Sequence, residues 1–186
     1  MDWIRQTLQT NGTLKNKFNI KDSEALQELE FRLTQYKYRS IPTSKITDIN
    51  DLKRIHRWLF SDLYDWAGEY RPGDFGKGTT EFFPRSRFES AIKNLNQQIQ
   101  HINQTSYQSD LVFATDLGKL MFDINVFHPF REGNGRAQRL FIQQLAKQNG
   151  KDLHIRKSDP AYPTYMNATI NDDYHLMAQA ILKAIK

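Results

Sequence analysis

A histidine and a glutamate lie four residues apart in a short segment whose residue types suit acid–base and metal chemistry. The segment reads Val126-Phe-His-Pro-Phe-Arg-Glu-Gly-Asn-Gly-Arg-Ala-Gln-Arg139. A neutral imidazole such as that of His128 accepts a proton from a hydroxyl group near pH 7. A carboxylate such as Glu132 is a natural ligand for Mg²⁺, because Mg²⁺ prefers one or two carboxylates together with phosphate oxygens. The pair predicts a general base and a metal ligand on one loop.

The turn that follows the glutamate predicts a binding place for an anion. Pro129 cannot continue a helix, so the preceding helix ends at about His128. Gly133 and Gly135, on either side of Asn134, permit a tight turn and let a ligand approach the backbone closely. A new helix starts directly afterwards, and its first N–H groups and its dipole attract negative charge.

Two arginines at the start of that helix indicate which anion is bound. Arg136 and Arg139 are three residues apart, so both guanidinium groups should lie on one helix face near its positive end. There they repel each other and oppose the dipole unless an anion lies between them. Guanidinium pairs are typical of phosphate binding.

Each of these features is common in isolation, because single histidines cap helices, glycine turns are frequent and most arginines are solvated. Their occurrence within twelve residues favours phosphoryl-type transfer. The remaining histidines lack a neighbouring carboxylate or histidine at metal-ligand spacing. We interpret them as surface or packed residues: His56, His101, His154 and His175.

The elements that must position this loop are predicted to be almost entirely helical. Helical periodicity covers residues 23–38, with Ser23 as the cap and a buried stripe of Ala25, Leu26, Leu29 and Leu33. Further helices are expected from residue 50 or 51, over 88–99, from 109 or 110 to 128, over 136–148, 165–170 and 174–185. Residues 68–84 are rich in glycine and read as a loop or short β-hairpin. The fold class is all-α with one small hairpin.

Length and composition bound the remaining possibilities. The 186 residues suit one domain, and residues 1–22 read as a loosely structured lead-in to it. The sequence has no cysteine, which fits a reducing cytoplasm, and no apolar run of about 18 residues that would span a membrane. A net charge of +5 favours anionic partners, so a basic helical domain that binds DNA without catalysis is one alternative. The basic residues are dispersed along the chain, however, and this argues against direct contact with nucleic acid.

Residues 128–139 resemble the signature of the Fic family, H-x-F-x-[D/E]-G-N-G-R-x-x-R, with all eight specified positions filled. The similarity extends upstream to residues 66–71 and to 77–84, which look like the flap of that family, and covers about residues 24–185. The resemblance implies a helical Fic domain over 23–186 that transfers AMP from ATP to a Ser, Thr or Tyr hydroxyl of another protein. UMP, phosphocholine or phosphate transfer on the same fold is the alternative.

The resemblance implies a role for each motif residue. His128 would deprotonate the target hydroxyl and Glu132 would hold Mg²⁺ between the α- and β-phosphates. Gly133, Asn134 and Gly135 would surround the phosphates. Arg136 would bind the β-phosphate and Arg139 the γ-phosphate, while Phe130 would pack into the core.

The flap would align an extended segment of the target by main-chain hydrogen bonds along a strand edge. The residues expected to do so are Lys77, Gly78, Thr79, Thr80, Glu81 and Phe82. An ordinary hairpin that covers the core is the alternative. The adenine pocket is expected to include Tyr162 and Met166, which could equally be core residues.

Many Fic proteins carry an inhibitory helix with the pattern [S/T]-x-x-x-E-[G/N], and this sequence has no such pattern at either end. Glu28 stands five residues after Ser23 instead of four, and no glutamate follows Glu132. A separate small antitoxin is therefore expected to place its glutamate against Arg139. The chain resembles bacterial Fic toxins, some of which modify DNA gyrase or topoisomerase IV, and also effector domains delivered into host cells.

Overall fold

Helices make up most of the structure, a computed structural model that describes residues 3–77 and 80–186. The all-α expectation is confirmed, and two two-residue strands are the only strands among the described residues. In chain order the elements are α1 (Trp3–Gln6), α2 (Ser23–Ser40), α3 (Asn50–Phe60), β1 (Gly76–Lys77), β2 (Thr80–Glu81), the 3₁₀ helix Arg85–Arg87, α4 (Phe88–Gln104), α5 (Asp110–Phe127), α6 (Asn134–Gln148), α7 (Tyr162–Ile170) and α8 (Tyr174–Ala184).

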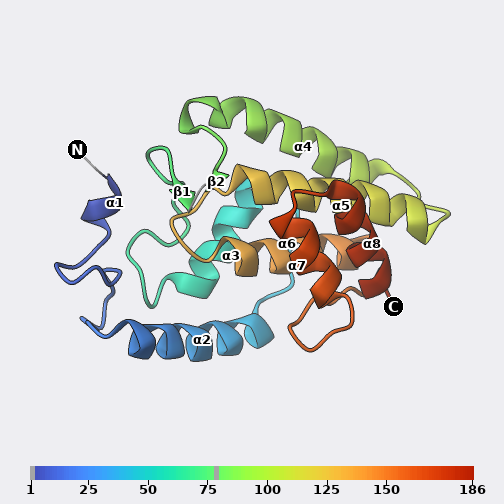
Figure 1. Cartoon of the computed structure of the whole chain (residues 1–186). Helices are drawn as coiled ribbons and strands as arrows, with labels where there is room; N and C mark the ends of the chain where they lie inside the picture. The colour runs from blue at the N-terminus through green and yellow to red at the C-terminus, as the bar shows by residue number, and fades with distance from the viewer. Residues whose placement is uncertain (1–2, 78–79) are drawn as a thin grey trace.

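Helix α5 is the centre of the bundle, with α4, α6 and α8 packed on it. Helix α3 packs between α6 and α2, so α2 and α4 lie on opposite sides of the molecule (Figure 1). The contact between α5 and α8 is close enough to require a glycine. A Cβ atom at Gly118 would lie 2.5 Å from the Cα of Ala178. This packing holds the middle of α5, the helix whose C-terminal end leads into the motif.

Helix α2 differs from the sequence expectation in its cap and in its buried face. The cap is Asp22, whose carboxylate accepts from the N–H of Ala25, and not Ser23. Of the expected stripe only Leu26 is buried, while Ala25 is exposed and the two other leucines are half-buried. Glu30 is buried instead. Periodicity missed it because a charged residue is rarely buried unless it is paired.

The segment before α2 is tied to the rest of the chain at several points. Leu8 and Leu14 form an isolated antiparallel bridge. The N–H of Lys17 donates to the carbonyl of Leu63 at 2.9 Å, and Nε of Arg131 donates to the hydroxyl of Thr7 at 2.9 Å. The segment is therefore more ordered than the lead-in expected from its sequence. The domain boundary at residue 22 stays a prediction.

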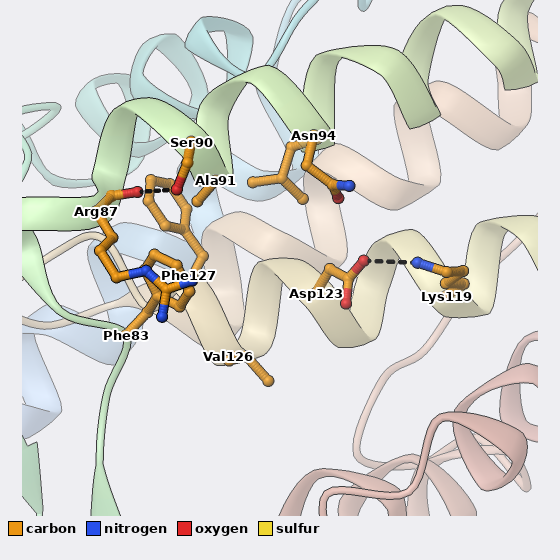
Figure 2. Close-up of a pocket in the computed structure, with 10 residues that line it drawn as sticks. Phe83, Arg87, Ser90, Ala91, Asn94, Lys119, Asp123, Val126 and Phe127 are labelled. Carbon is orange, nitrogen blue, oxygen red and sulfur yellow. Dashed lines mark hydrogen bonds and ion pairs between the residues drawn. The ribbon is translucent and has the colours of Figure 1, made fainter.

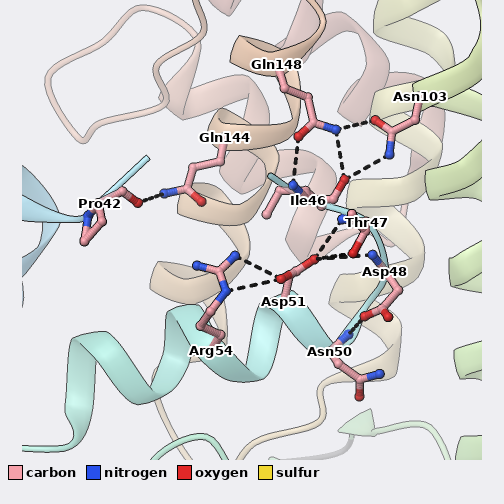
Figure 3. Close-up of polar contacts among 10 residues, drawn as sticks. All are labelled: Pro42, Ile46, Thr47, Asp48, Asn50, Asp51, Arg54, Asn103, Gln144 and Gln148. Atoms are coloured by element: carbon pink, nitrogen blue, oxygen red, sulfur yellow. Dashed lines mark hydrogen bonds and ion pairs between the residues drawn. The ribbon is translucent and has the colours of Figure 1, made fainter. Parts of the chain in front are cut away.

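The loop that joins α2 to α3 is fixed by side chains from three helices (Figure 3). The amide of Gln148 bonds both the N–H of Ile46, at 2.8 Å, and its carbonyl, at 2.9 Å. Asn103 donates to the same carbonyl at 2.9 Å. Asp51 accepts from the N–H of Thr47 at 2.8 Å. These bonds hold the start of α3, which carries His56 and Phe60 beneath the motif loop.

The segment 68–84, expected to be a loop or a short hairpin, is mostly loop and contains a two-residue antiparallel ladder. Gly76 pairs with Glu81, and Lys77 pairs with Thr80. After the ladder, the N–H of Phe82 donates to the carbonyl of Phe75 at 3.0 Å. Residues 78 and 79, which the sequence analysis placed in the flap, lie outside the described residues. The docking role of the flap stays a prediction.

Candidate active site

The motif loop joins the C-terminus of α5 to the N-terminus of α6. His128 is the C-cap of α5 and has a left-handed backbone conformation with φ of 41°. A residue other than glycine costs roughly 1–2 kcal/mol in this conformation. Pro129 and Phe130 follow and are buried, which confirms the expectation that Phe130 packs into the core. The strained backbone of His128 must therefore be held by surrounding groups.

The guanidinium group of Arg71 supplies that support. Its Nε donates to the carbonyl of His128 at 3.0 Å, its Nη1 to the carbonyl of Gly73 at 2.7 Å, and its Nη2 to the carbonyl of Phe83. The backbone N–H of Arg71 donates to the carbonyl of Pro129 at 2.8 Å. The side chain is only 1% exposed. One buried arginine thus links the motif loop to the end of the flap.

The flap also contacts the imidazole of His128 directly. The ring of Phe82 stacks on the His128 ring, with centroids 3.6 Å apart and an angle of 5° between the planes. Of the predicted flap residues, Phe82 is therefore in contact with the predicted base. Lys77, Thr80 and Glu81 lie in the adjoining ladder.

Asn134 shapes the motif loop through its side chain. Its amide nitrogen donates to the carbonyl of Phe130 at 2.9 Å, and its amide oxygen accepts from the N–H of Phe130 at 2.9 Å. Because the loop engages the amide, the predicted contact of Asn134 with phosphate would fall to its backbone. Helix α6 begins at Asn134, two residues earlier than the sequence indicated. The first N–H groups of a helix have no partner inside it, and here they belong to motif residues.

Gly133 brings the loop close to α3. It has φ of 80°, and a Cβ atom there would lie 2.3 Å from Cζ of Phe60. No other residue fits this position without moving the ring. The neighbouring Glu132 side chain is about half exposed, and its Oε1 accepts from the N–H of Gly133 at 2.9 Å. The predicted metal ligand therefore lies at the open side of the turn.

The two motif arginines extend to different partners. Nη2 of Arg136 forms an ion pair with the carboxylate of Glu30. Arg139 reaches α7, where its Nη1 lies 3.3 Å from the hydroxyl of Tyr165 and its guanidinium lies 5.9 Å from the ring centroid of Tyr162. The expectation that only an anion relieves their repulsion is wrong, because Glu30 already pairs with Arg136.

The two residues expected in the adenine pocket both come from α7. Tyr162 lies at its start and Met166 one turn later, and both are half-buried against the core. Tyr162 is in contact with Arg139, so the structure brings it to the motif. Their part in binding adenine stays a prediction.

His56 supports the motif loop from below, a role that its place in the sequence does not predict. Its Nδ1 accepts from the N–H of Gly68 at 2.8 Å, so its Nε2 must carry the proton that it donates to the carbonyl of Glu132 at 2.9 Å. Its ring stacks on Phe130 with centroids 3.8 Å apart. Burial, opposed in part by the bond to Glu132, lowers the pKa of His56 to about 4. The ring is therefore neutral near pH 7.

The donor set suits a metal ion that arrives together with phosphate. Within residues 3–77 and 80–186 there is no group of three or more His, Cys, Asp or Glu side chains that could hold a metal by themselves. A single half-exposed carboxylate, that of Glu132, matches the way Mg²⁺ binds through one or two carboxylates plus substrate phosphates.

Within residues 3–77 and 80–186 no helix is long and apolar enough to cross a membrane.

A cavity of about 410 Å³ lies between α4 and α5 beside the end of the flap (Figure 2). Phe83, Arg87, Val126 and Phe127 line it together with residues further along both helices. No residue of the 128–139 motif does. This cavity is therefore separate from the place that the motif assigns to phosphate.

Comparisons with known proteins agree with this geometry. The model of the Fic/DOC family matches residues 46–146. The protein adenylyltransferase VbhT of Bartonella schoenbuchensis is 34% identical over 145 residues, which are 75% of this chain and 30% of that protein. The probable protein adenylyltransferase Fic of Escherichia coli K12 is 33% identical over 144 residues, which are 75% of this chain and 70% of that protein.

Solved structures show the same fold. The N-terminal Fic domain of a VirB-translocated effector from Bartonella sp. AR 15-3 superposes with a TM-score of 0.88 at 20% identity, covering 100% of this chain and 93% of that one. The N-terminal Fic domain of a putative cell filamentation protein from Bartonella quintana, solved with bound ADP, gives a TM-score of 0.83 at 25% identity over 98% and 95% of the two chains.

Replacing Arg71 by methionine tests the support of the loop. Arg71→Met leaves three half-buried carbonyls without their donor, and a fully buried carbonyl in that state costs about 1–3 kcal/mol. We expect a loss of roughly 2 kcal/mol in the free energy of unfolding, measured by urea titration. Arg32→Met is the control, because Arg32 forms an exposed pair with Glu28 that contributes little. Equal stability of the two variants would contradict the role of Arg71.

The lowered pKa of His56 predicts how stability varies with pH. Between pH 6.5 and 4 the unfolded chain binds a proton at residue 56 and the folded chain does not, so stability falls as the pH falls. We expect the stability advantage of the wild type over His56→Gln to shrink by about 1.4 kcal/mol per pH unit in this window. Urea titrations of both proteins at pH 7, 6 and 5 measure it. A constant difference would show that His56 does not titrate as described.

Proposed function

This chain belongs to the Fic/DOC family, and from that premise we propose that it is a protein adenylyltransferase, which transfers AMP from ATP to a Ser, Thr or Tyr hydroxyl of another protein. The observation that carries the proposal is the placement of the imidazole of His128 at the turn that leads into α6, with Arg71 and Phe82 holding it. Relatives at 33–34% identity that are named protein adenylyltransferases support it.

In the proposed reaction, the imidazole of His128 takes the proton of the target hydroxyl. The hydroxyl oxygen attacks the α-phosphorus of ATP, and the bond from that phosphorus to the oxygen bridging the α- and β-phosphates breaks. Pyrophosphate leaves, and the target carries AMP as a phosphodiester. A positioned general base contributes roughly 10²–10⁴-fold to such a step.

Phosphate binding is assigned to the beginning of α6. The backbone of residues 133–135 and the dipole of the helix attract the phosphate oxygens. Arg136 meets the β-phosphate and Arg139 the γ-phosphate, in keeping with their divergence toward α2 and α7. The aromatic side chain of Tyr162, next to Arg139, is assigned to the nucleotide side of the site.

Glu132 is the residue assigned to Mg²⁺. A bound Mg²⁺ would neutralise charge on the α- and β-phosphates during transfer. The half-exposed carboxylate of Glu132 is oriented by the N–H of Gly133. It thereby stays at the turn, within reach of phosphates held by the start of α6.

The flap is assigned to the target protein. A target segment paired along the edge of the hairpin, at residues 77–82, would be aligned by main-chain hydrogen bonds. The lone pair of an imidazole nitrogen lies in the plane of the ring, so the target hydroxyl must reach the edge of the His128 ring, one face of which is covered by Phe82. The stacking contact therefore limits the directions from which a hydroxyl can approach.

We infer that the enzyme acts as a toxin in the bacterial cytoplasm and is restrained by a separate antitoxin. Within residues 3–77 and 80–186 no carboxylate lies within ion-pairing distance of Arg139. A glutamate from a partner helix would fit there and exclude the γ-phosphate. DNA gyrase and topoisomerase IV are the first targets to test. Delivery into a host cell is the alternative, since several structural neighbours are described as translocated effectors.

The assay for the reaction compares ATP labelled at the α- or the γ-phosphorus in a bacterial lysate. AMP transfer places only the α-label on protein, and we expect His128→Ala to reduce labelling roughly 10²–10⁴-fold. His175→Ala is the matched control, because His175 is exposed and lies far along the chain from the motif. Label from the γ-phosphorus on protein, or an unaffected His128→Ala, would overturn the proposal. Mass spectrometry of the labelled proteins identifies the target.

A peptide test addresses the antitoxin. A helical peptide that carries the pattern [S/T]-x-x-x-E-[G/N] should inhibit AMP transfer competitively with ATP, because its glutamate would occupy Arg139. The same peptide with alanine in place of the glutamate should inhibit at least about tenfold less, since a charged hydrogen bond contributes roughly 1.5–3 kcal/mol. Equal inhibition by both peptides would show that Arg139 is not the point of contact.

A further inference from the structure

Outside the motif, helix α2 carries a buried carboxylate, that of Glu30. The side chain of Glu30 is 10% exposed, and it faces the motif across the bundle. Helix α2 lies before residue 46, where the family match begins. A buried carboxylate is destabilising unless both of its oxygens are paired, so the partners of Glu30 indicate what it does.

Both oxygens of Glu30 are engaged, by different elements. Oε1 accepts from Nη2 of Arg136 at the start of α6. Oε2 accepts from the hydroxyl of Tyr64, which is itself 1% exposed. Burial, and then the neighbouring Glu30 carboxylate, raise the pKa of Tyr64, so its hydroxyl keeps the proton that it donates. The hydroxyl of Tyr64 thereby holds the carboxylate in place independently of Arg136.

Arg136 is confined on two sides. Glu30 binds one edge of its guanidinium, and the ring of Phe60 lies below it with 4.8 Å between Cζ and the ring centroid. The carboxylate of Glu132 is 3.8 Å away. A guanidinium has five N–H donors, and Glu30 accepts a hydrogen bond from Nη2. The remaining edge can meet an anion at the turn.

We propose that Glu30 is a positioning residue, which holds the guanidinium of Arg136 in the orientation that binds the β-phosphate of the nucleotide. The inference rests on the proposed function, which assigns the β-phosphate to Arg136. It makes α2, together with Tyr64, part of the phosphate-binding machinery.

Two physical effects support the assignment. An arginine side chain loses roughly 2 kcal/mol of rotamer entropy when it is fixed, and Glu30 fixes it before the nucleotide arrives. A cation in the first turn of a helix also opposes the helix dipole, and the negative charge of Glu30 offsets that repulsion. Both effects make Arg136 ready to bind phosphate, which is how preorganisation raises affinity.

The test is a double-mutant cycle on ADP binding, measured by calorimetry with the full chain. Glu30→Ala should weaken ADP binding roughly 3- to 10-fold, because Arg136 then loses its conformational entropy only when ADP binds, which lowers the affinity. In an Arg136→Ala background the same substitution should change the affinity less than about 2-fold. AMP, which has no β-phosphate, should bind the wild type and Glu30→Ala equally well.

Two further variants separate positioning from folding. Glu30→Gln keeps the size and one acceptor but not the charge, so it should restore part of the affinity lost in Glu30→Ala, even if Glu30→Ala melts at a lower temperature. Glu28→Ala is the matched control, since Glu28 lies on the exposed side of the same helix. It should leave ADP affinity unchanged.

The outcomes are distinguishable. If Glu30→Ala binds ADP more tightly, Glu30 competes with phosphate and the inference is overturned. An equal loss with and without Arg136 would also overturn it, because a loss of general stability does not depend on that residue. A wild-type chain that binds neither ADP nor ATP would instead remove the proposed function from which the inference starts.

Discussion

The position of the predicted base depends on one buried guanidinium. His128 has a left-handed backbone that costs roughly 1–2 kcal/mol, and the loop around it contains a proline and two glycines that provide no regular hydrogen bonding. Arg71 offsets this cost with charge-assisted hydrogen bonds to the carbonyls of His128, Gly73 and Phe83. Because these carbonyls are half-buried, loss of the donor would remove bonds that water replaces only in part. The strained conformation is therefore maintained from outside the motif.

Charge at the start of α6 is balanced by residues from distant parts of the chain. Two arginines beside the positive end of a helix are unfavourable in isolation. The structure separates them: Arg136 turns to the carboxylate of Glu30 on α2, and Arg139 turns to the aromatic rings of α7. Of the two, Arg136 alone forms an ion pair with a carboxylate within the described residues 3–77 and 80–186. Arg136 is consequently held by an ion pair, whereas Arg139 is the arginine that the proposed function leaves for the γ-phosphate or for a partner's carboxylate.

Much of this could be predicted from the sequence, and the failures have physical reasons. The positions of most helices followed from apolar periodicity, although α1 was not expected and α7 begins at Tyr162 instead of Tyr165. The glycines and proline of the motif located the turn. Side chains that act through backbone groups escaped detection, because nothing in the sequence shows which carbonyl His56 or Arg71 will face. Glu30 escaped because it stands 106 residues before Arg136 and breaks the apolar stripe of its helix. The sequence indicates a start of α6 at residue 136 and not at Asn134, because Asn134 both bonds the backbone of the loop and is the first residue of the helix.

The link between the flap and the base explains how a target could be aligned without being recognised by sequence. The end of the flap and the backbone of His128 accept hydrogen bonds from the same planar guanidinium, so one cannot shift against the other without losing a bond to Arg71. The stacking of Phe82 on the imidazole adds a second contact between them. In the proposed function, a segment paired with the strand edge of the flap would therefore be placed relative to the imidazole by its backbone alone. Its side chains would be free to vary, apart from the hydroxyl that reaches His128.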